Sequence, residues 1–252
     1  MHRFHIDSPI DFANNACSVV LSSEESYHAA KVLRLVSGQA VELFDGENRF
    51  SGIIESISEK QVHVNITEQL PTFEPSVKIV LWQGWPKAEK FEWIVQKATE
   101  LGVHEIWPVI MERSIAKVDK QERIQKKMER YNRIALEATK QCSRAHVPYI
   151  ADIRKQSQAI ADIKENFDSI FVAWEEENSL LFSKAIESAI LKNGKLNRVL
   201  IVIGPEGGIS EDEFSEFSEL GAVSVSLGKR ILRTETAGIC AISVLLSKMN
   251  EI

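Results

Sequence analysis

The segment that most constrains the fold is an aliphatic run that ends in a glycine-rich turn. Residues 199–203 are all β-branched or aliphatic and lead directly into Gly204-Pro205-Glu206-Gly207-Gly208. Such a run predicts a strand covered on both faces in a mainly parallel sheet. Three glycines within five residues permit backbone angles and close approaches that a Cβ would forbid. The segment predicts an α/β fold with a turn at the end of a buried strand, where ligands bind in open α/β sheets.

A helix, a second strand and a second loop follow this turn. Ser210 and Glu213 have the spacing of a capping box, which starts a helix. Residues 222–227 alternate into a strand, and Gly228 opens the next loop. Neither the P-loop pattern nor the dinucleotide-binding glycine pattern occurs, and Glu206 would repel a polyphosphate. The turn favours a cationic or neutral ligand, and the alternative is a tight turn without a ligand.

The two loops together resemble a known family. GPEGG, followed by LGKRILRTETA, resembles the paired signature of the RsmE family of the SPOUT superfamily. The stretches HAAKVLRLVSGQAVELFDG, KAEKFEWIVQKATELGVHEIWPV and EATKQCSRAHVP also resemble the family and occur in the family order, so the likeness spans nearly the whole chain. The resemblance implies an S-adenosylmethionine-dependent methyltransferase that modifies uridine N3 in small-subunit (16S) ribosomal RNA.

The resemblance also implies a fold and a cofactor site. The expected fold is an α/β, SPOUT-type, mostly parallel sheet with a C-terminal trefoil knot, which periodicity alone would not predict because knots are so rare. The two loops would hold the cofactor. The segment AWEEE lies just past a predicted strand end and is a candidate third wall of the site, with a solvated helix start as the alternative. The residues expected to contact it are Ala173, Gly204, Pro205, Glu206, Gly207, Leu227, Gly228, Ile231, Leu232, Thr236 and Ala237.

Arg233 and Glu235 are the candidate catalytic residues. Uridine N3 carries a proton at neutral pH, so the site must accept that proton or stabilise the charge that spreads onto O2 and O4. Arg233 suits the second role because a guanidinium stays charged and offers two donors to a carbonyl. Glu235 is the weaker candidate, as a base. A loop salt bridge is the alternative role for both residues.

The amino-terminal part, residues 1–72, predicts a small β-rich domain. Residues 40–44, 50–57 and 62–66 form short alternating runs joined by tight turns, which indicates a meander that closes into a small barrel. A helix is predicted from residue 22 or 23 to about 35. The resemblance makes this part a PUA-like RNA-binding domain. A barrel that only positions the second domain is the alternative.

Residues 73–252 are assigned to the methyltransferase domain, because two prolines within residues 71–75 indicate a linker. Strands alternate with helices in this part, which predicts a mostly parallel sheet with helices on both faces. The predicted strands are 77–82, 103–109, 169–173, 199–203 and 222–227, and the predicted helices start or end near residues 90–101, 120–143, 158–166, 210–221 and 236–249. The last helix is apolar enough for a homodimer contact, with packing inside one subunit as the alternative.

The charge distribution favours RNA despite a net charge of −6. Between residues 113 and 147 ten Lys or Arg face four acids, and such a basic segment steers a polyanion to one side of the molecule. The alternative is an ordinary solvated helix of mixed charge. With the resemblance, the expected RNA contacts are Arg3, His28, Arg34, Arg113, Arg123, Lys126, Lys127 and Arg144.

Other classes are disfavoured. Three isolated cysteines without CxxC spacing indicate neither a disulfide framework nor a metal site, and no metal is expected. No apolar run approaches the roughly 20 residues of a membrane span, and the polar start is no signal peptide, so a cytoplasmic protein is expected. Two other functions stay open: a SPOUT ribose 2′-O-methyltransferase acting on transfer RNA, and a non-catalytic RNA-binding assembly factor.

Overall fold

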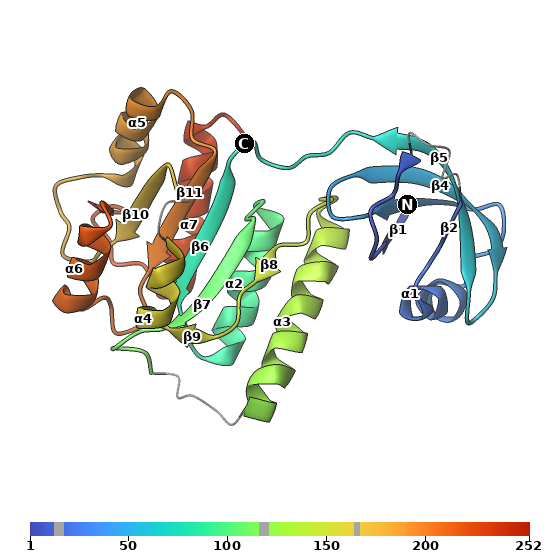
Figure 1. The fold of residues 1–252 in the computed structure, drawn as a ribbon, viewed down its shortest axis with the longest axis horizontal. Coiled ribbons are helices and arrows are strands. Elements are labelled where there is room, and N and C mark those ends of the chain that lie inside the picture. Colours follow the sequence, from blue (N-terminus) through green and yellow to red (C-terminus); the bar gives the residue numbers. More distant parts are fainter. Residues whose placement is uncertain (13–17, 116–120, 164–166) are drawn as a thin grey trace. The chain divides into compact units, whose positions relative to one another are not determined.

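The computed structural model describes residues 1–12, 18–115, 121–163 and 167–252 (Figure 1). The chain divides into two compact units. Unit 1 comprises Met1–Glu74 together with Thr139–Val147, and unit 2 comprises Pro75–Ala138 together with Pro148–Ile252. The sequence did not predict that a second, distant segment belongs to the first unit.

Unit 1 is built on a five-stranded mixed sheet with the order β1-β3-β4-β5-β2. Strands β3, β4 and β5 pair antiparallel, which confirms the predicted meander, whereas β1 pairs parallel with β3. Alternate apolar side chains such as Phe4, Leu43 and Ile54 form a buried core between the strands and the helical segment. The bounds are β1 (His2–His5), β2 (Ser18–Val20), β3 (Ala40–Phe44), β4 (Arg49–Ile57) and β5 (Val62–Leu70).

The helix predicted from residue 22 to residue 35 is shorter and irregular. Ser22 caps α1 (Ser23–Tyr27) by accepting from the Glu25 backbone N–H at 3.2 Å. The chain then widens into a π-helical turn, η2 (His28–Val32), which is rare outside functional or strained segments. Arg34 follows with a φ of 53°, a left-handed conformation that ends the helix before residue 35.

Unit 2 contains a seven-stranded sheet in which all the pairings are parallel, as predicted. The order is β12-β10-β11-β6-β7-β8, and β9 also pairs with β7. The strands β8 and β9 were not predicted, because two residues carry no periodicity. The bounds are β6 (Lys78–Gly84), β7 (Glu105–Ile110), β8 (Tyr149–Ile150), β9 (Arg154–Lys155), β10 (Ser169–Ala173), β11 (Arg198–Ile203) and β12 (Val223–Val225).

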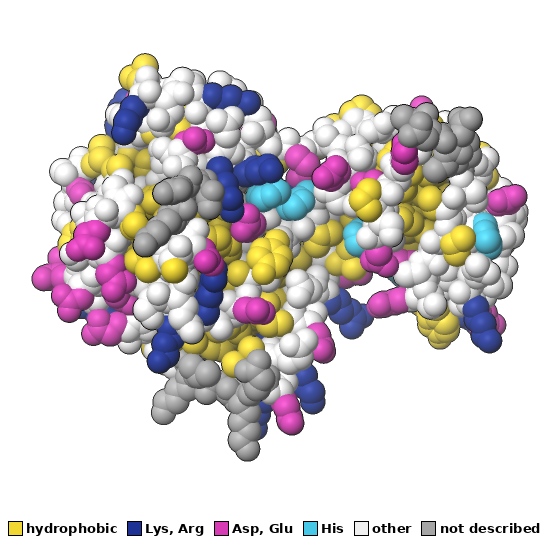
Figure 2. Space-filling model, viewed as in Figure 1, with side chains coloured by type: hydrophobic (Ala, Val, Ile, Leu, Met, Phe, Trp, Pro, Cys, Tyr) yellow, Lys and Arg dark blue, Asp and Glu magenta, His cyan; other side chains and the backbone are white. Residues whose placement is uncertain are grey.

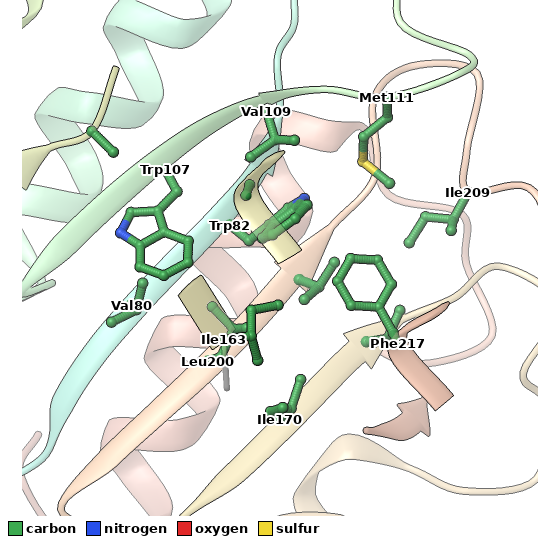
Figure 3. Packing of buried hydrophobic residues seen from close by; sticks show 14 residues of the cluster. Val80, Trp82, Trp107, Val109, Met111, Ile163, Ile170, Leu200, Ile209 and Phe217 are labelled. Atoms are coloured by element: carbon green, nitrogen blue, oxygen red, sulfur yellow. The ribbon is translucent and has the colours of Figure 1, made fainter. Parts of the chain in front are cut away.

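Helices cover both faces of this sheet (Figure 1). On one face, α2 (Ala88–Glu100), α5 (Phe182–Asn193) and α7 (Thr234–Lys248) pack together and α7 contacts β6 and β11. On the other face, Trp82, Trp107 and Phe217 lie in one apolar cluster with residues of α4 (Gln156–Ala159) and α6 (Glu211–Glu219), as Figure 3 shows. The apolar side of α7 is therefore buried largely within its own unit.

Three helix predictions differ from the structure. The helix α5 was missed, since its sequence mixes polar and apolar residues without a clear stop signal. The helix predicted over residues 158–166 starts at Gln156 and tightens into a 3₁₀ turn, η3 (Ile160–Ile163), while 164–166 lie outside the described residues. The long basic helix is α3 (Gln121–Gln141), and residues 116–120, which include Lys117, Asp119 and Lys120 of the basic segment, lie outside the described residues.

The end of β6 lies directly against the glycine-rich turn. Gly84 is the last residue of β6, and a Cβ there would lie 2.6 Å from the Gly204 carbonyl carbon and 2.6 Å from Pro205 Cδ. Real Cβ atoms do not approach that closely. The absence of a side chain at Gly84 is what lets the two backbone segments cross in contact.

We expect Gly84→Ala to destabilise the protein by about 1–3 kcal/mol, because the new methyl group overpacks a site with no free volume. Urea unfolding at equilibrium measures this free energy. Ser247→Ala, an exposed substitution on α7, serves as the control and should change the free energy by no more than about 0.5 kcal/mol. An unchanged urea midpoint for Gly84→Ala would contradict this contact.

Candidate cofactor and RNA site

Three strand ends lie side by side at one edge of the unit 2 sheet. The strands β10, β11 and β6 are neighbours and parallel, so Ala173, Ile203 and Gly84 end at the same edge. The loops that leave these ends are the segment after Ala173 and the glycine-rich turn 204–208. The segment after Ala173 and the turn 204–208 are distant in sequence and were predicted to share a site. They leave the sheet from neighbouring strands at the same edge.

The loop after β10 is fixed to β12 by one carboxylate. Glu177 accepts hydrogen bonds from the Ser179 hydroxyl at 2.6 Å, the Ser179 backbone N–H at 2.7 Å and the Leu180 backbone N–H at 3.1 Å. The Ser224 hydroxyl on β12 donates to its other oxygen. These side-chain and backbone donors favour the ionised form and lower the pKa of Glu177 to about 2.

The glycines of the turn are explained by contacts within the protein. Gly208 has a φ of 78°, and the Glu175 carboxylate lies where its side chain would be. A Cβ at Gly207 would lie 2.8 Å from both Cβ and the carbonyl oxygen of Arg113. The lack of a side chain at Gly207 is thus required by Arg113, and a bulky substitution there would disturb packing before it reached a ligand.

Buried hydrogen bonds join the turn to the start of α7. The Gln83 amide donates to the Thr234 hydroxyl at 2.7 Å, and that hydroxyl donates to the Gly204 carbonyl at 2.6 Å. Gln83 is fully buried at the end of β6, where an aliphatic residue would be the usual choice. These bonds hold β6, the turn and the RTETA segment in one place.

A charge cluster connects the same two loops. The Lys90 ammonium on α2 lies 3.1 Å from Glu206 Oε1 and 3.5 Å from Glu235 Oε2. The carboxylates are mostly buried, and Oε2 of each has no hydrogen-bond partner among the described residues. Two negative charges and one positive charge leave this cluster with a net negative charge, which favours a cationic ligand.

The remaining predicted cofactor residues differ in exposure. Leu227 and Leu232 are half-buried, whereas Ile231 is 94% exposed, although it follows the GKR segment of the same loop. Thr236 is exposed on α7 and Ala237 is buried. Gly228 adopts a φ of 116°, which only glycine tolerates without strain. As cofactor contacts, all of these residues stay predictions.

Arg233, the first candidate catalytic residue, lies at the start of α7. It is the N-cap residue of α7, it is exposed, and in the described part of the chain its guanidinium has no hydrogen-bond or ion-pair partner. Lys229 and Arg230, which the sequence analysis did not single out, are also exposed in the same loop. Both cations could be seen in the sequence, because they form the GKR part of the stretch LGKRILRTETA.

Two of the predicted RNA-binding arginines have structural roles in unit 1. Arg3, whose side chain is 8% exposed, donates to Glu42 at 2.9 Å and to the carbonyls of Thr139, Lys140 and Arg144 at 2.7 Å each. Its guanidinium is thereby occupied in closing the last turn of α3 against β1. Four of its five N–H donors are used within the protein, which disfavours a phosphate contact at Arg3.

Arg144 is similarly buried, with a side chain that is 5% exposed and paired with Glu74 at 2.7 Å. Burial alone would raise the pKa of Glu74, but Arg144 and two backbone N–H groups outweigh it and hold that pKa below its usual range. Of the other unit 1 candidates, Arg34 is exposed and His28 is half-buried, with Nδ1 3.9 Å from Glu25. Arg34 and His28 remain candidates for RNA contact.

The cations of α3 form an exposed stripe in unit 2. Arg123, Lys126, Arg130 and Arg133 recur at helical spacing and are all exposed, and Arg130 pairs with Glu92 at 2.6 Å. Lys127 lies over the Trp85 ring at 4.7 Å and is only half-exposed. Figure 2 shows basic side chains along α3, whereas acidic side chains gather over α6.

Arg113, the last predicted RNA contact, is exposed beside the glycine-rich turn, and its guanidinium lies 3.5 Å from the Gly207 carbonyl. Elsewhere, the described residues contain no group of three or more His, Cys, Asp or Glu arranged to hold a metal ion. Within the described ranges, no helix combines the length and apolar character that crossing a membrane requires.

Four residues of the candidate site were not predicted from the sequence: Gln83, Gly84, Lys90 and Thr234. A glutamine and a glycine at the end of an otherwise aliphatic strand, in IVLWQG, were the signal for the first two. Lys90 and Thr234 lie in stretches that were quoted for the resemblance, KAEKFEW and RTETA. Nothing in a single sequence indicated which residues of those stretches meet in space.

Comparison with known proteins agrees with this arrangement. A family model described as "RNA methyltransferase domain" matches residues 73–246, and one described as "RNA methyltransferase PUA domain" matches residues 21–67. The ribosomal RNA small subunit methyltransferase E of Bacillus subtilis is 34% identical over 97% of this chain and 96% of its own length. The namesake from Aquifex aeolicus is 35% identical over 75% of this chain and 76% of its own length.

Solved structures show the same fold. The methyltransferase E of Neisseria gonorrhoeae, bound to S-adenosylmethionine, superposes with a TM-score of 0.81 at 26% identity and covers 98% of this chain and 97% of that one. A Legionella pneumophila protein in complex with the same cofactor gives a TM-score of 0.81 at 33% identity over 97% and 96% of the two chains.

The parallel sheet with its two joined loops, preceded by a small mixed sheet, defines an RNA methyltransferase with a PUA domain. The chain belongs to the ribosomal RNA small subunit methyltransferase E family. This confirms the predicted family and its α/β architecture.

The loop after β10, which Glu177 joins to β12, makes the free energy of unfolding depend on pH. The pKa of Glu177 is lower in the folded protein than in the unfolded chain, so its contribution is complete above the unfolded pKa and is lost as pH falls toward about 2. We expect Glu177→Gln to unfold at lower urea concentration than the wild type at pH 7. The difference should shrink between about pH 4.5 and pH 3. A difference that is independent of pH would contradict a charge effect.

Proposed function

We propose that the protein transfers a methyl group from S-adenosylmethionine to N3 of a specific uridine in 16S ribosomal RNA of the small ribosomal subunit. What supports this function is the joining of the two signature loops at one sheet edge, through the Thr234 hydroxyl on the Gly204 carbonyl and through Lys90 between Glu206 and Glu235. A relative named ribosomal RNA small subunit methyltransferase E matches 97% of this chain.

The charge at that edge fits the cofactor, which supplies an electrophilic methyl group on a positively charged sulfur. Glu206 Oε2 is buried without a hydrogen-bond partner among the described residues, and Glu235 Oε2 meets only the Lys90 ammonium at 3.5 Å, so a cation would compensate the remaining negative charge. The residues that would hold the cofactor are those of the turn 204–207, Ala173 and the half-buried leucines of the second loop, Leu227 and Leu232. These residues would hold the sulfur and the methyl carbon of the cofactor in line with uridine N3.

The developing charge on the base is assigned to Arg233. As N3 loses its proton, negative charge spreads to O2 and O4, and the exposed guanidinium, which has no partner among the described residues, can donate to one of them. The positive end of α7 adds to this field, because Arg233 caps that helix. Glu235 is mostly buried and paired with Lys90, so it is less accessible than Arg233 to the uridine.

The RNA must present an unpaired or flipped uridine, since N3 lies on the pairing edge of the base. The α3 stripe and the exposed cations Lys229 and Arg230 supply a basic surface for its backbone. The protein would work in the cytoplasm as a homodimer, with the half-buried Ile239 and Val244 of α7 at the contact. The trefoil knot implied by the family resemblance is part of the proposal.

We expect Arg233→Ala to lower the single-turnover rate of methylation by about two to three orders of magnitude, as loss of one oxyanion donor does. Cofactor affinity should change much less, because the guanidinium acts on the base. Lys195→Ala, an exposed cation after α5 with no proposed part in binding, is the control, and its rate should remain near that of the wild type. A variant Arg233→Ala that keeps its rate but binds RNA or cofactor weakly would make Arg233 a positioning residue instead.

The α3 stripe predicts a salt-dependent RNA affinity. Reversing charge with Lys126→Glu and Arg133→Glu should weaken binding and reduce the slope of log K against log salt by about one per lost phosphate contact. Lys192→Glu with Lys195→Glu, two exposed lysines near the end of α5, is the control of equal charge change. Titration of labelled RNA at several salt concentrations measures both slopes. Equal losses of RNA affinity and equal changes of slope in the two double variants would show that binding depends on the net charge of the protein and not on the α3 stripe.

A further inference from the structure

Lys90 connects the two signature loops although it belongs to neither. It lies in the first turn of α2, and its ammonium is within 3.1 Å of Glu206 and 3.5 Å of Glu235. Glu206 is in the turn after β11, and Glu235 is in the first turn of α7. One side chain from a third element therefore bridges two segments that are about 30 residues apart in sequence.

The electrostatics make this bridge necessary. The carboxylates are 17% and 16% exposed; Glu206 Oε2 is buried without a hydrogen-bond partner among the described residues, and Glu235 Oε2 meets only the Lys90 ammonium. Without the ammonium, two like charges would face each other with little water to screen them. The loops would then separate, or one carboxylate would turn outward to solvent.

We propose that Lys90 is a positioning residue for the cofactor site, which holds the turn 204–208 against the start of α7 and cancels one of two carboxylate charges. One net negative charge remains for a cationic ligand. This role rests on the proposed function, since it takes the bound molecule to be S-adenosylmethionine. It assigns Lys90 no contact with the reacting atoms.

The same helix offers a matched control. Lys97 lies on α2 with the same 34% side-chain exposure and an ion pair of 2.8 Å to Glu100. Glu100 belongs to the same helix, so Lys97 joins no separate segments. Lys90→Met and Lys97→Met thus remove the same charge from the same helix, and only the first removes a bridge between loops. Lys90→Arg keeps the charge and should restore the wild-type behaviour.

Calorimetry with two ligands separates positioning from charge. S-Adenosylhomocysteine has an uncharged sulfur, so it reports the position of the loops alone, whereas S-adenosylmethionine also reports the charge of the site. We expect Lys90→Met to weaken S-adenosylhomocysteine binding by about tenfold, since the carboxylates lose their shared partner. The affinity for S-adenosylmethionine should fall less. The ratio of S-adenosylmethionine affinity to S-adenosylhomocysteine affinity should therefore rise by on the order of threefold.

Unchanged affinity for S-adenosylhomocysteine in folded Lys90→Met would overturn the positioning role. Equal losses for both ligands would overturn the charge-setting role, as would the same ratio shift in Lys97→Met. Circular dichroism and the urea midpoint establish that each variant is folded. If the wild-type protein itself binds neither ligand, the proposed function fails, and that outcome is distinct from a failure confined to the Lys90 variants.

Discussion

The contact on which the rest of the site depends is the crossing of β6 with the glycine-rich turn. Gly84 has no side chain, so the backbone of Gly204-Pro205 can lie directly on it. The Thr234 hydroxyl then reaches the Gly204 carbonyl at 2.6 Å while accepting from buried Gln83. A strand end, a turn and a helix start are fixed to one another before any ligand binds, which is the preorganisation that methyl transfer requires.

This crossing brings together charges that would otherwise repel. Glu206 and Glu235 are mostly buried at the same edge, and Lys90 compensates only one of them. A net negative cluster is unsuited to phosphates and suited to a sulfonium, while the basic residues of α3 and of the second loop are exposed, as the proposed RNA contact requires. The separation of the two charge types gives a physical reason why an acidic protein can use a cationic cofactor on an anionic substrate.

Much of the fold could be predicted from the sequence. The contacts between distant segments could not, for physical reasons. The run 199–203 and the Ser210–Glu213 capping box predicted their strand and helix correctly, because local periodicity and capping determine those elements. The burial of Arg3 could not be predicted, since its partners are carbonyls at the end of α3 that only the fold brings near. Lys90 was hidden for the same reason: its two carboxylates come from distant segments.

Methylation of uridine N3 in 16S ribosomal RNA is tested most directly by mass spectrometry of nucleosides. Small-subunit RNA from a strain that lacks the gene is compared with RNA from the same strain carrying the wild-type gene or the Arg233→Ala variant. The predicted result is that 3-methyluridine is absent without the gene, returns with the wild type and stays greatly reduced with the variant. Unchanged 3-methyluridine in the deletion strain, or loss of a ribose-methylated nucleoside instead, would contradict it.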